Sequence, residues 1–133
     1  MNKSFLPLFY LMFTPLLWSQ DIYHTKTSNP HKEYDNILVK KLSDDPLQTS
    51  FMIWIKRDVK AHKHNHHTEN IYVIKGKGEM QIGDQKFIIK KGDYFTIPKG
   101  TPHALRVLSH KPVQVISIQS PKFVGNDRVF IKE

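Results

Sequence analysis

A chain of 133 residues without cysteine supports one domain and excludes disulfides, thiolate metal sites and cysteine nucleophiles. The formal net charge is +8, but the lysines are scattered over the whole chain, only three arginines occur, and aromatic residues are not interleaved with them. This pattern predicts a basic, solvated surface and no nucleic-acid partner.

The first predicted element is a short apolar segment. Lys3 gives a basic start, residues 5–18 are apolar apart from two prolines and one threonine, and polar sequence follows Ser19. This is the layout of a secretory signal peptide, and the run is too short and too interrupted by proline for a good membrane span. We predict a signal peptide at 1–19, export to the periplasm or beyond the cell, and no integral span after processing. An apolar element packed on the domain and an uncleaved anchor are the alternatives.

Residues 20–36 are polar and form an expected extended lead-in to a domain at 37–133. Short apolar runs separated by glycine, proline and aspartate turns then predict β-strands. The expected strands are 37–42, 50–57, 70–75, 79–82, 86–89, 94–97, 104–108, 113–120 and 128–131. No stretch of ten or more residues carries a helical period. Several strands are apolar on both faces, which predicts an all-β sandwich or barrel and favours a homodimer.

The histidines are unevenly distributed. Five of the eight lie between His62 and His103, and four of them fall within residues 62–67. A His-x-His pair on a strand places both imidazoles on one face, about 6–7 Å apart. Glu69 follows the next turn, and His103 follows the proline-glycine turn at 98–102. Three imidazoles and one carboxylate suit a divalent first-row metal ion and leave positions open for a ligand.

Two segments resemble the sequence motifs of the cupin superfamily. Residues 62–76 resemble the first motif, with the spacing His-x-His, four residues, Glu, six residues, Gly. Residues 92–103 resemble the second, with Gly, five residues, Pro-x-Gly, two residues, His. Val107 stands where the second motif usually ends in asparagine, which is not a ligand in the family. The resemblance covers roughly residues 50–120 and indicates a small, single-domain protein similar to the type-2 cupins.

The resemblance implies a double-stranded β-helix, or jelly-roll, cupin barrel with one metal ion at its centre. The ligands would be His62, His64, Glu69 and His103. The family favours iron, manganese or nickel, whereas the affinity order of divalent ions favours zinc or copper. Cupins include dioxygenases, isomerases, decarboxylases, epimerases and non-enzymatic binders, so the fold alone does not specify a reaction.

The first functional hypothesis is a mononuclear, dioxygenase-like metalloenzyme that acts on a small organic substrate. Strand parity places Ile71, Val73 and Leu105 beside the ligands, which favours a partly apolar substrate. The alternative is a non-enzymatic module that binds a metal and a small ligand. No motif places a separate general base near the site, which argues for the alternative, and we assign no catalytic residue.

His66 and His67 do not fit the family spacing. We expect them to be exposed turn histidines, or at most partners behind a metal ligand, with loose surface binding of zinc or nickel as the alternative. Imidazole must be neutral to bind a metal ion, so histidines with an ordinary pKa predict metal release as the pH falls from about 6 to 5.

Overall fold

The computed structural model describes residues 21–132, so the predicted signal peptide lies outside the described residues. The described chain forms ten strands and no helix. The strands are β1 (Ile37–Asp44), β2 (Thr49–Ile55), β3 (Asp58–Lys63), β4 (Thr68–Lys75), β5 (Lys77–Ile82), β6 (Gln85–Lys90), β7 (Tyr94–Ile97), β8 (His103–Val107), β9 (Val113–Ser120) and β10 (Val129–Phe130). Nothing between residues 21 and 132 is a helix long and apolar enough to cross a membrane.

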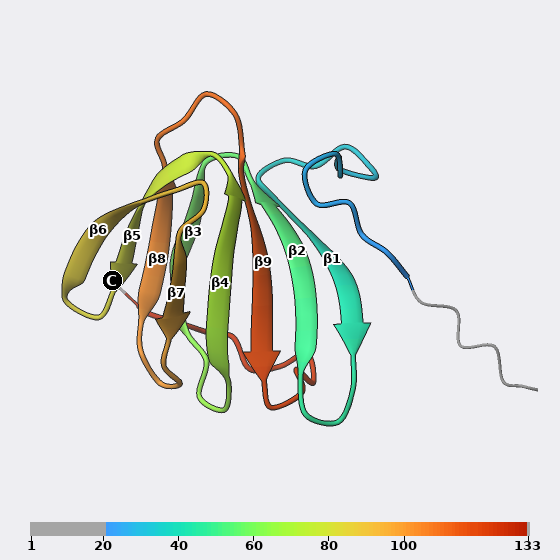
Figure 1. The fold of residues 1–133 in the computed structure, drawn as a ribbon. Helices are drawn as coiled ribbons and strands as arrows, with labels where there is room; N and C mark the ends of the chain where they lie inside the picture. The colour runs from blue at the N-terminus through green and yellow to red at the C-terminus, as the bar shows by residue number, and fades with distance from the viewer. Residues whose placement is uncertain (1–20, 133) are drawn as a thin grey trace, which may run out of the picture.

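The strands form two antiparallel sheets that face each other (Figure 1). The first sheet has the order β1-β2-β9-β4-β7, and the second has the order β10-β3-β8-β5-β6. β9 lies between β2 and β4, and β8 lies between β3 and β5, so strands far apart in the sequence pair in both sheets. The predicted all-β jelly roll is confirmed.

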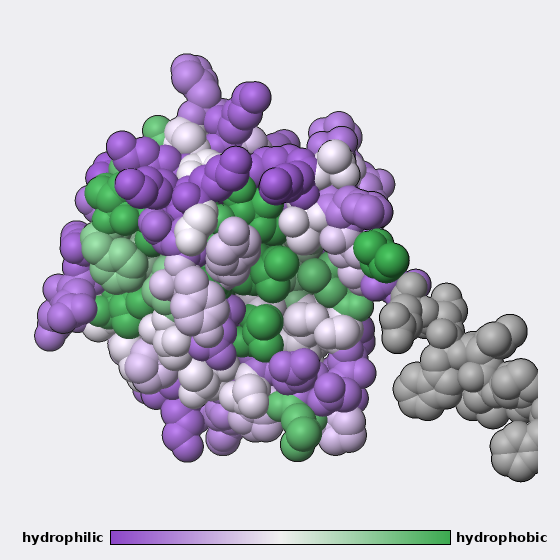
Figure 2. All heavy atoms as spheres, viewed as in Figure 1, coloured by the Kyte–Doolittle hydropathy of each residue, from purple (hydrophilic) through white to green (hydrophobic). Residues whose placement is uncertain are grey.

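Apolar side chains fill part of the space between the sheets. The buried members of this core are Ile55, Ile71, Val73, Met80, Ile89, Ile97, Leu105, Val113 and Val115. A second cluster on the other face of the first sheet comprises Leu38, Met52, Trp54 and Ile74, and Tyr34 of the lead-in packs against it. Figure 2 shows apolar side chains gathered near the centre of the face that the first sheet presents. Both faces of this sheet are therefore apolar, as predicted from the continuous apolar runs.

Most strands agree with the predicted ranges to within one or two residues, and β7 and β9 coincide with them. The strand missing from the prediction is β3, which carries His62. Polar residues dominate β3, and only Val59 and Ala61 interrupt them, so the segment lacks the apolar run that predicts a strand. Pairing with β8 and β10 holds β3 in the sheet despite this polarity.

Gly76 lets the turn from β4 to β5 pass close to β9. Its φ is +87°, and a Cβ built there would lie 2.7 Å from the Cα of Val113 and 2.9 Å from the carbonyl oxygen of Pro112. We expect Gly76→Ala to lower the free energy of unfolding by about 2–4 kcal/mol, because the clash is with backbone and adds to the left-handed strain. Gly100→Ala is the control, with a φ of +76° and open space around the added Cβ, and should cost only about 1 kcal/mol. Equal losses of unfolding free energy in the two variants, measured by urea unfolding, would contradict the close approach of Gly76 to β9.

Candidate metal centre

Three histidines from the two motifs converge in the barrel. His62 lies on β3, His64 follows the end of that strand, and His103 begins β8. One ring nitrogen from each of the three lies within 4.8 Å of the others, and all three side chains are buried. The ring centroids of His62 and His64 are 5.1 Å apart, and those of His62 and His103 are 4.2 Å apart. The structure therefore brings together the three histidines predicted from the sequence.

Backbone carbonyl groups fix the orientation of these rings. Nδ1 of His62 donates to the carbonyl of Lys60 at 2.8 Å, and Nδ1 of His103 donates to the carbonyl of Thr101 at 3.1 Å. Nδ1 of His64 donates to the backbone carbonyl of Asp127. A carbonyl oxygen only accepts, so each ring carries its proton on Nδ1 and keeps the Nε2 lone pair available. This tautomer is the one a metal site with Nε2 ligands requires.

Glu69, on β4, approaches two of the three histidines. Its Oε2 lies 3.7 Å from Nε2 of His64 and 3.6 Å from Nε2 of His103. Its other oxygen, Oε1, accepts hydrogen bonds from the Ser117 hydroxyl and from Nε2 of Gln119, both on β9. These two β9 residues hold the carboxylate so that Oε2 faces the histidines. The sequence motifs gave no signal for either, because they are ordinary polar residues on an inward-facing strand.

The chemistry of this donor set fits a divalent first-row ion. Donors at about 2.0–2.2 Å from one ion are about 2.8–3.6 Å from their neighbours, from octahedral to tetrahedral geometry. The separations of Glu69 from His64 and His103 lie at the upper end of this range or just above it. Glu69 lies outside the group of donors within 4.8 Å of one another, so a four-ligand site requires its carboxylate to move toward His62. Three neutral imidazoles and one carboxylate carry a single negative charge, which partly neutralises a divalent cation.

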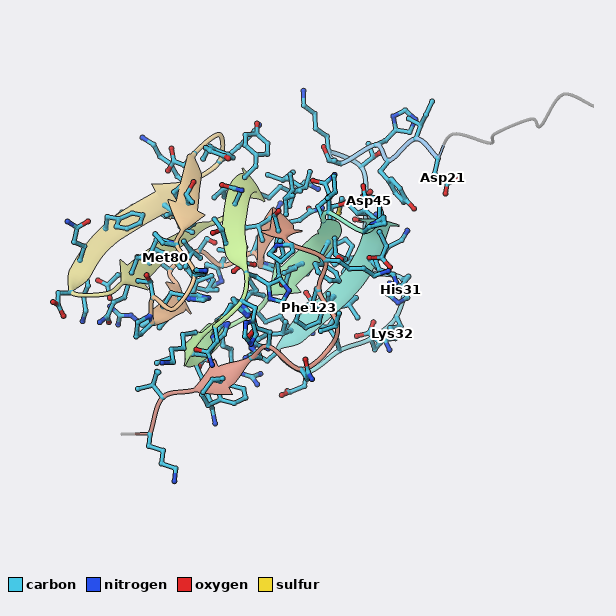
Figure 3. All side chains as sticks on the ribbon, turned by 90° about the horizontal axis from the view of Figure 1, so that it is seen from below. Asp21, His31, Lys32, Asp45, Met80 and Phe123 are labelled. Atoms are coloured by element: carbon cyan, nitrogen blue, oxygen red, sulfur yellow. The ribbon has the colours of Figure 1, made fainter. Side chains whose placement is uncertain are left out.

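The candidate ligands line one cavity of about 180 Å³ between the sheets. Most of its wall is apolar, with Phe51, Ile53 and Ile71 from the first sheet and Met80 and Leu105 from the second. Figure 3 views the molecule from below and labels Met80 on β5 and Phe123 of the C-terminal segment, which also line the cavity. The predicted placement of Ile71 and Leu105 beside Glu69 is thus correct, whereas Val73 is buried in the core and does not line the cavity. The cavity suits a small, largely apolar ligand.

His67 is buried, which corrects the expectation of an exposed turn residue; His66 is exposed as predicted. Nδ1 of His67 contacts Oδ2 of Asp127, and Nε2 of His67 lies 3.0 Å from the carbonyl of Lys122. The prediction failed because sequence spacing gave no sign that residues 122–127 return to this loop.

Asp127 anchors the C-terminal segment (residues 121–132) on the loop between β3 and β4 (residues 64–67, the histidine loop). Its buried carboxylate accepts the backbone N–H groups of Asn65 and His66 at 2.9 Å each, and that of His67 at 3.2 Å. Burial alone would raise the pKa of this carboxyl group, but these N–H groups and the His67 ring outweigh it and hold the pKa below its usual range.

His64, His67 and Asp127 also place one candidate donor each within 4.8 Å of one another. Their donor atoms are largely engaged in hydrogen bonds to protein groups: both nitrogens of His67 face oxygens, and both carboxylate oxygens of Asp127 accept N–H groups. A metal ion there would have to displace several of these bonds. This second cluster is therefore a structural anchor, and the group around His62, His64 and His103 is the better metal site.

Burial changes the acid–base behaviour of the candidate ligands. It lowers the pKa of His62 to about 3, and the neighbouring His103 acts in the same direction. Burial also lowers the pKa of His103, although Glu69 opposes this shift. Since the pKa of both imidazoles is lowered, proton competition for the metal should begin at a lower pH than the window of 6 to 5 expected from ordinary histidines.

These shifts predict how the metal-free protein responds to acid. Its free energy of unfolding should fall as the pH decreases from about 6.5 toward 3, because the unfolded chain binds a proton in this range that folded His62 does not. Urea unfolding in the presence of a chelator, at about pH 7 and about pH 4.5, measures the loss. The His62→Gln variant cannot titrate and should lose less, whereas His66→Gln should behave like the native chain. An equal fall in unfolding free energy between the two pH values in both variants would show that His62 is not the group responsible.

Comparison with known proteins agrees with the fold and with the two motifs. A family model described as a cupin domain matches residues 51–119. An uncharacterized protein from Aquifex aeolicus is 36% identical over 98 residues, which cover 74% of this chain and 80% of that protein. Quercetin 2,3-dioxygenase from Bacillus subtilis is 41% identical over 51 residues, which cover 38% of this chain and only 14% of the dioxygenase.

A solved structure extends the agreement to most of the chain. A conserved protein with a double-stranded β-helix domain from Klebsiella pneumoniae superposes with a TM-score of 0.70 and 17% identity, covering 87% of this chain and 100% of that one. At this identity the likeness shows the fold alone. The family match, which spans both histidine motifs, and the jelly roll together show that the protein belongs to the cupin family.

Proposed function

We propose that the protein is an exported cupin that binds one divalent metal ion through His62, His64, Glu69 and His103. The observation that supports this proposal is the cluster of three buried imidazoles, each with its Nδ1 bonded to a backbone carbonyl, together with the approach of Glu69 Oε2 to two of them, His64 and His103. Iron, manganese or nickel is the proposed ion, with zinc or copper as the alternatives. His66 and His67 are not among the proposed ligands.

The proposed activity is a dioxygenase-like oxidation of a small organic substrate. The apolar cavity and the likeness to part of a quercetin 2,3-dioxygenase support it. A bound divalent ion would supply Lewis acidity and, if it is redox-active, electron transfer. The residues of the chain would hold the substrate against apolar walls and keep bulk water away, while Ser117 and Gln119 keep the Glu69 carboxylate oriented.

One observation favours a second candidate, a binding module without turnover. Among residues 21–132, the cavity wall contains no carboxylate other than Glu69 and no lysine, so a separate general base is absent from the described wall. In this case the metal ion would hold a ligand or stabilise the barrel.

Metal analysis and oxygen uptake distinguish the two candidates. Protein purified from its own host should contain about one equivalent of a divalent ion by mass spectrometry. A dioxygenase-like enzyme should then consume oxygen with a member of a panel of diketones, phenols and thiols, and the His103→Ala variant should not. Full metal occupancy without oxygen uptake across the panel would favour the binding module. Absence of any bound ion would contradict both.

Export and dimerisation are further parts of the proposal. The apolar segment at 5–18 supports processing after Ser19, which mass spectrometry of the mature N-terminus would test. The exposed Tyr72 and Tyr94, on the neighbouring strands β4 and β7, support a dimer. Light scattering would give twice the monomer mass for a dimer and the monomer mass otherwise.

A further inference from the structure

Arg128 lies where the cavity meets the C-terminal segment. The residue is solvent-exposed overall, yet its side chain lines the same cavity as the candidate metal ligands. The chain's other two arginines are paired on the surface, Arg57 with Asp35 at 2.7 Å and Arg106 with Glu79 at 3.3 Å. Among residues 21–132, no carboxylate lies within ion-pair distance of the Arg128 guanidinium, and its nearest aromatic partner is Phe130, whose ring centroid is 5.5 Å away.

The backbone is fixed on both sides of Arg128. The preceding residue, Asp127, is held by three backbone N–H groups of the histidine loop. The following residues, Val129 and Phe130, pair with Lys63 and His62 on β3, and the N–H of Ile131 donates to the carbonyl of Ala61 at 3.0 Å. Anchoring before and after this residue holds the guanidinium near the cavity with little loss of freedom on binding a ligand.

The charge around the cavity favours an anion. Burial lowers the pKa of Arg128, and the Glu69 carboxylate, which lines the same cavity, opposes this shift. A guanidinium nevertheless stays protonated at neutral pH. With a divalent ion bound, the ion contributes +2, Arg128 +1 and Glu69 −1, so the cavity would carry a net charge of +2 while the histidines are neutral.

The remainder of the cavity limits the ligand's size and polarity. Its volume of about 180 Å³ slightly exceeds the cavity of about 150 Å³ that encloses benzene in an engineered protein. Gln119, which is also buried in the wall, donates through Nε2 to Glu69, and this bond identifies its other amide atom as the oxygen. That Oε1 has no hydrogen-bond partner among the described residues, so a hydroxyl or amine of a ligand would satisfy it.

We propose that this cavity takes a small organic anion, with an apolar body about the size of one ring and a carboxylate or similar oxyanion that pairs with Arg128. The planar guanidinium fork matches a carboxylate in bidentate geometry, and the apolar walls accept the rest of the molecule. This inference rests on the proposed metal-binding function, because the ion adds to the positive charge of the cavity.

Benzoate and benzamide are matched probes, since they share a ring and a similar shape but differ in charge. Calorimetric titration into the metal-loaded full-length protein at neutral pH should show benzoate binding roughly tenfold or more tightly than benzamide. The Arg128→Gln variant should lose most of this preference, and Arg128→Lys should keep part of it. Arg106→Gln is the control, because Arg106 is paired with Glu79 on the surface, and it should leave the preference unchanged.

The outcomes separate this inference from the proposed function. Metal content is measured first on every variant, and an ion-free native protein would overturn the metal site itself. If the native protein and Arg128→Gln hold metal equally but both prefer benzoate to the same extent, the anion binds the ion alone and the role of Arg128 is wrong. If the metal-loaded native protein shows no preference for benzoate, the anionic ligand class is wrong.

Discussion

Replacing His103 with alanine should lower the affinity for a divalent metal ion by more than about 100-fold while the barrel stays folded. Changes to groups that merely orient a metal ligand typically cost 10–100-fold, and loss of a direct ligand should exceed that range. His103 is the proposed ligand that β8 brings across the barrel to the donors from β3 and β4. Chelator competition followed by metal analysis gives the affinity, and circular dichroism reports whether the sheets persist.

His66→Ala is the matched control for this experiment. His66 lies in the same histidine-rich stretch, but its side chain is exposed and its backbone N–H makes the bond to Asp127, which alanine retains. The variant should bind metal as the native protein does. If His66→Ala releases the ion and His103→Ala retains it, the ion sits on the surface stretch and the buried site is wrong.

The Asp127→Ala variant should lose about 3–5 kcal/mol of unfolding free energy. The substitution removes the acceptor of three backbone N–H groups and of the buried His67 ring, and unpaired buried donors are costly. Metal affinity should fall as well, since the Asp127 backbone carbonyl orients His64 and the segment that carries it would loosen. Urea unfolding and chelator competition measure the two effects.

Asp45→Asn provides a control with similar local hydrogen bonds. Asp45 is exposed, and one carboxylate oxygen accepts the N–H groups of Leu47 and Gln48, which an asparagine oxygen can also accept. This change should cost less than about 1 kcal/mol. Losses of the same size in Asp127→Ala and Asp45→Asn would show that the C-terminal segment does not stabilise the histidine loop.

The sequence predicted those parts of the protein whose signals are local. Alternating or continuous apolar runs bounded by glycine and proline turns mark β4, β7 and β9, because such residues form a strand wherever it is placed. The spacing of the two motifs identified the four candidate ligands before any fold was known. The structure brings the three histidines into one group and places Oε2 of Glu69 3.7 Å from His64 and 3.6 Å from His103.

The features that were missed depend on contacts between distant residues. His67 is buried because Asp127 and the Lys122 carbonyl, at least 55 residues away, enclose it. Arg128 was not predicted to lie at the cavity for a similar reason, because its position there depends on the pairing of β10 with β3. A polar strand such as β3 also gives no periodic signal of its own. Local pattern cannot predict which polar residue meets which partner across a sheet.

The most direct test of the metal site is anomalous diffraction from a crystal of the metal-loaded protein. The proposal predicts one strong peak about 2.0–2.3 Å from Nε2 of His62, His64 and His103 and from Oε2 of Glu69. A peak bound instead by His66 or other surface groups, or no ordered ion among these four side chains in crystals that contain metal, would contradict it.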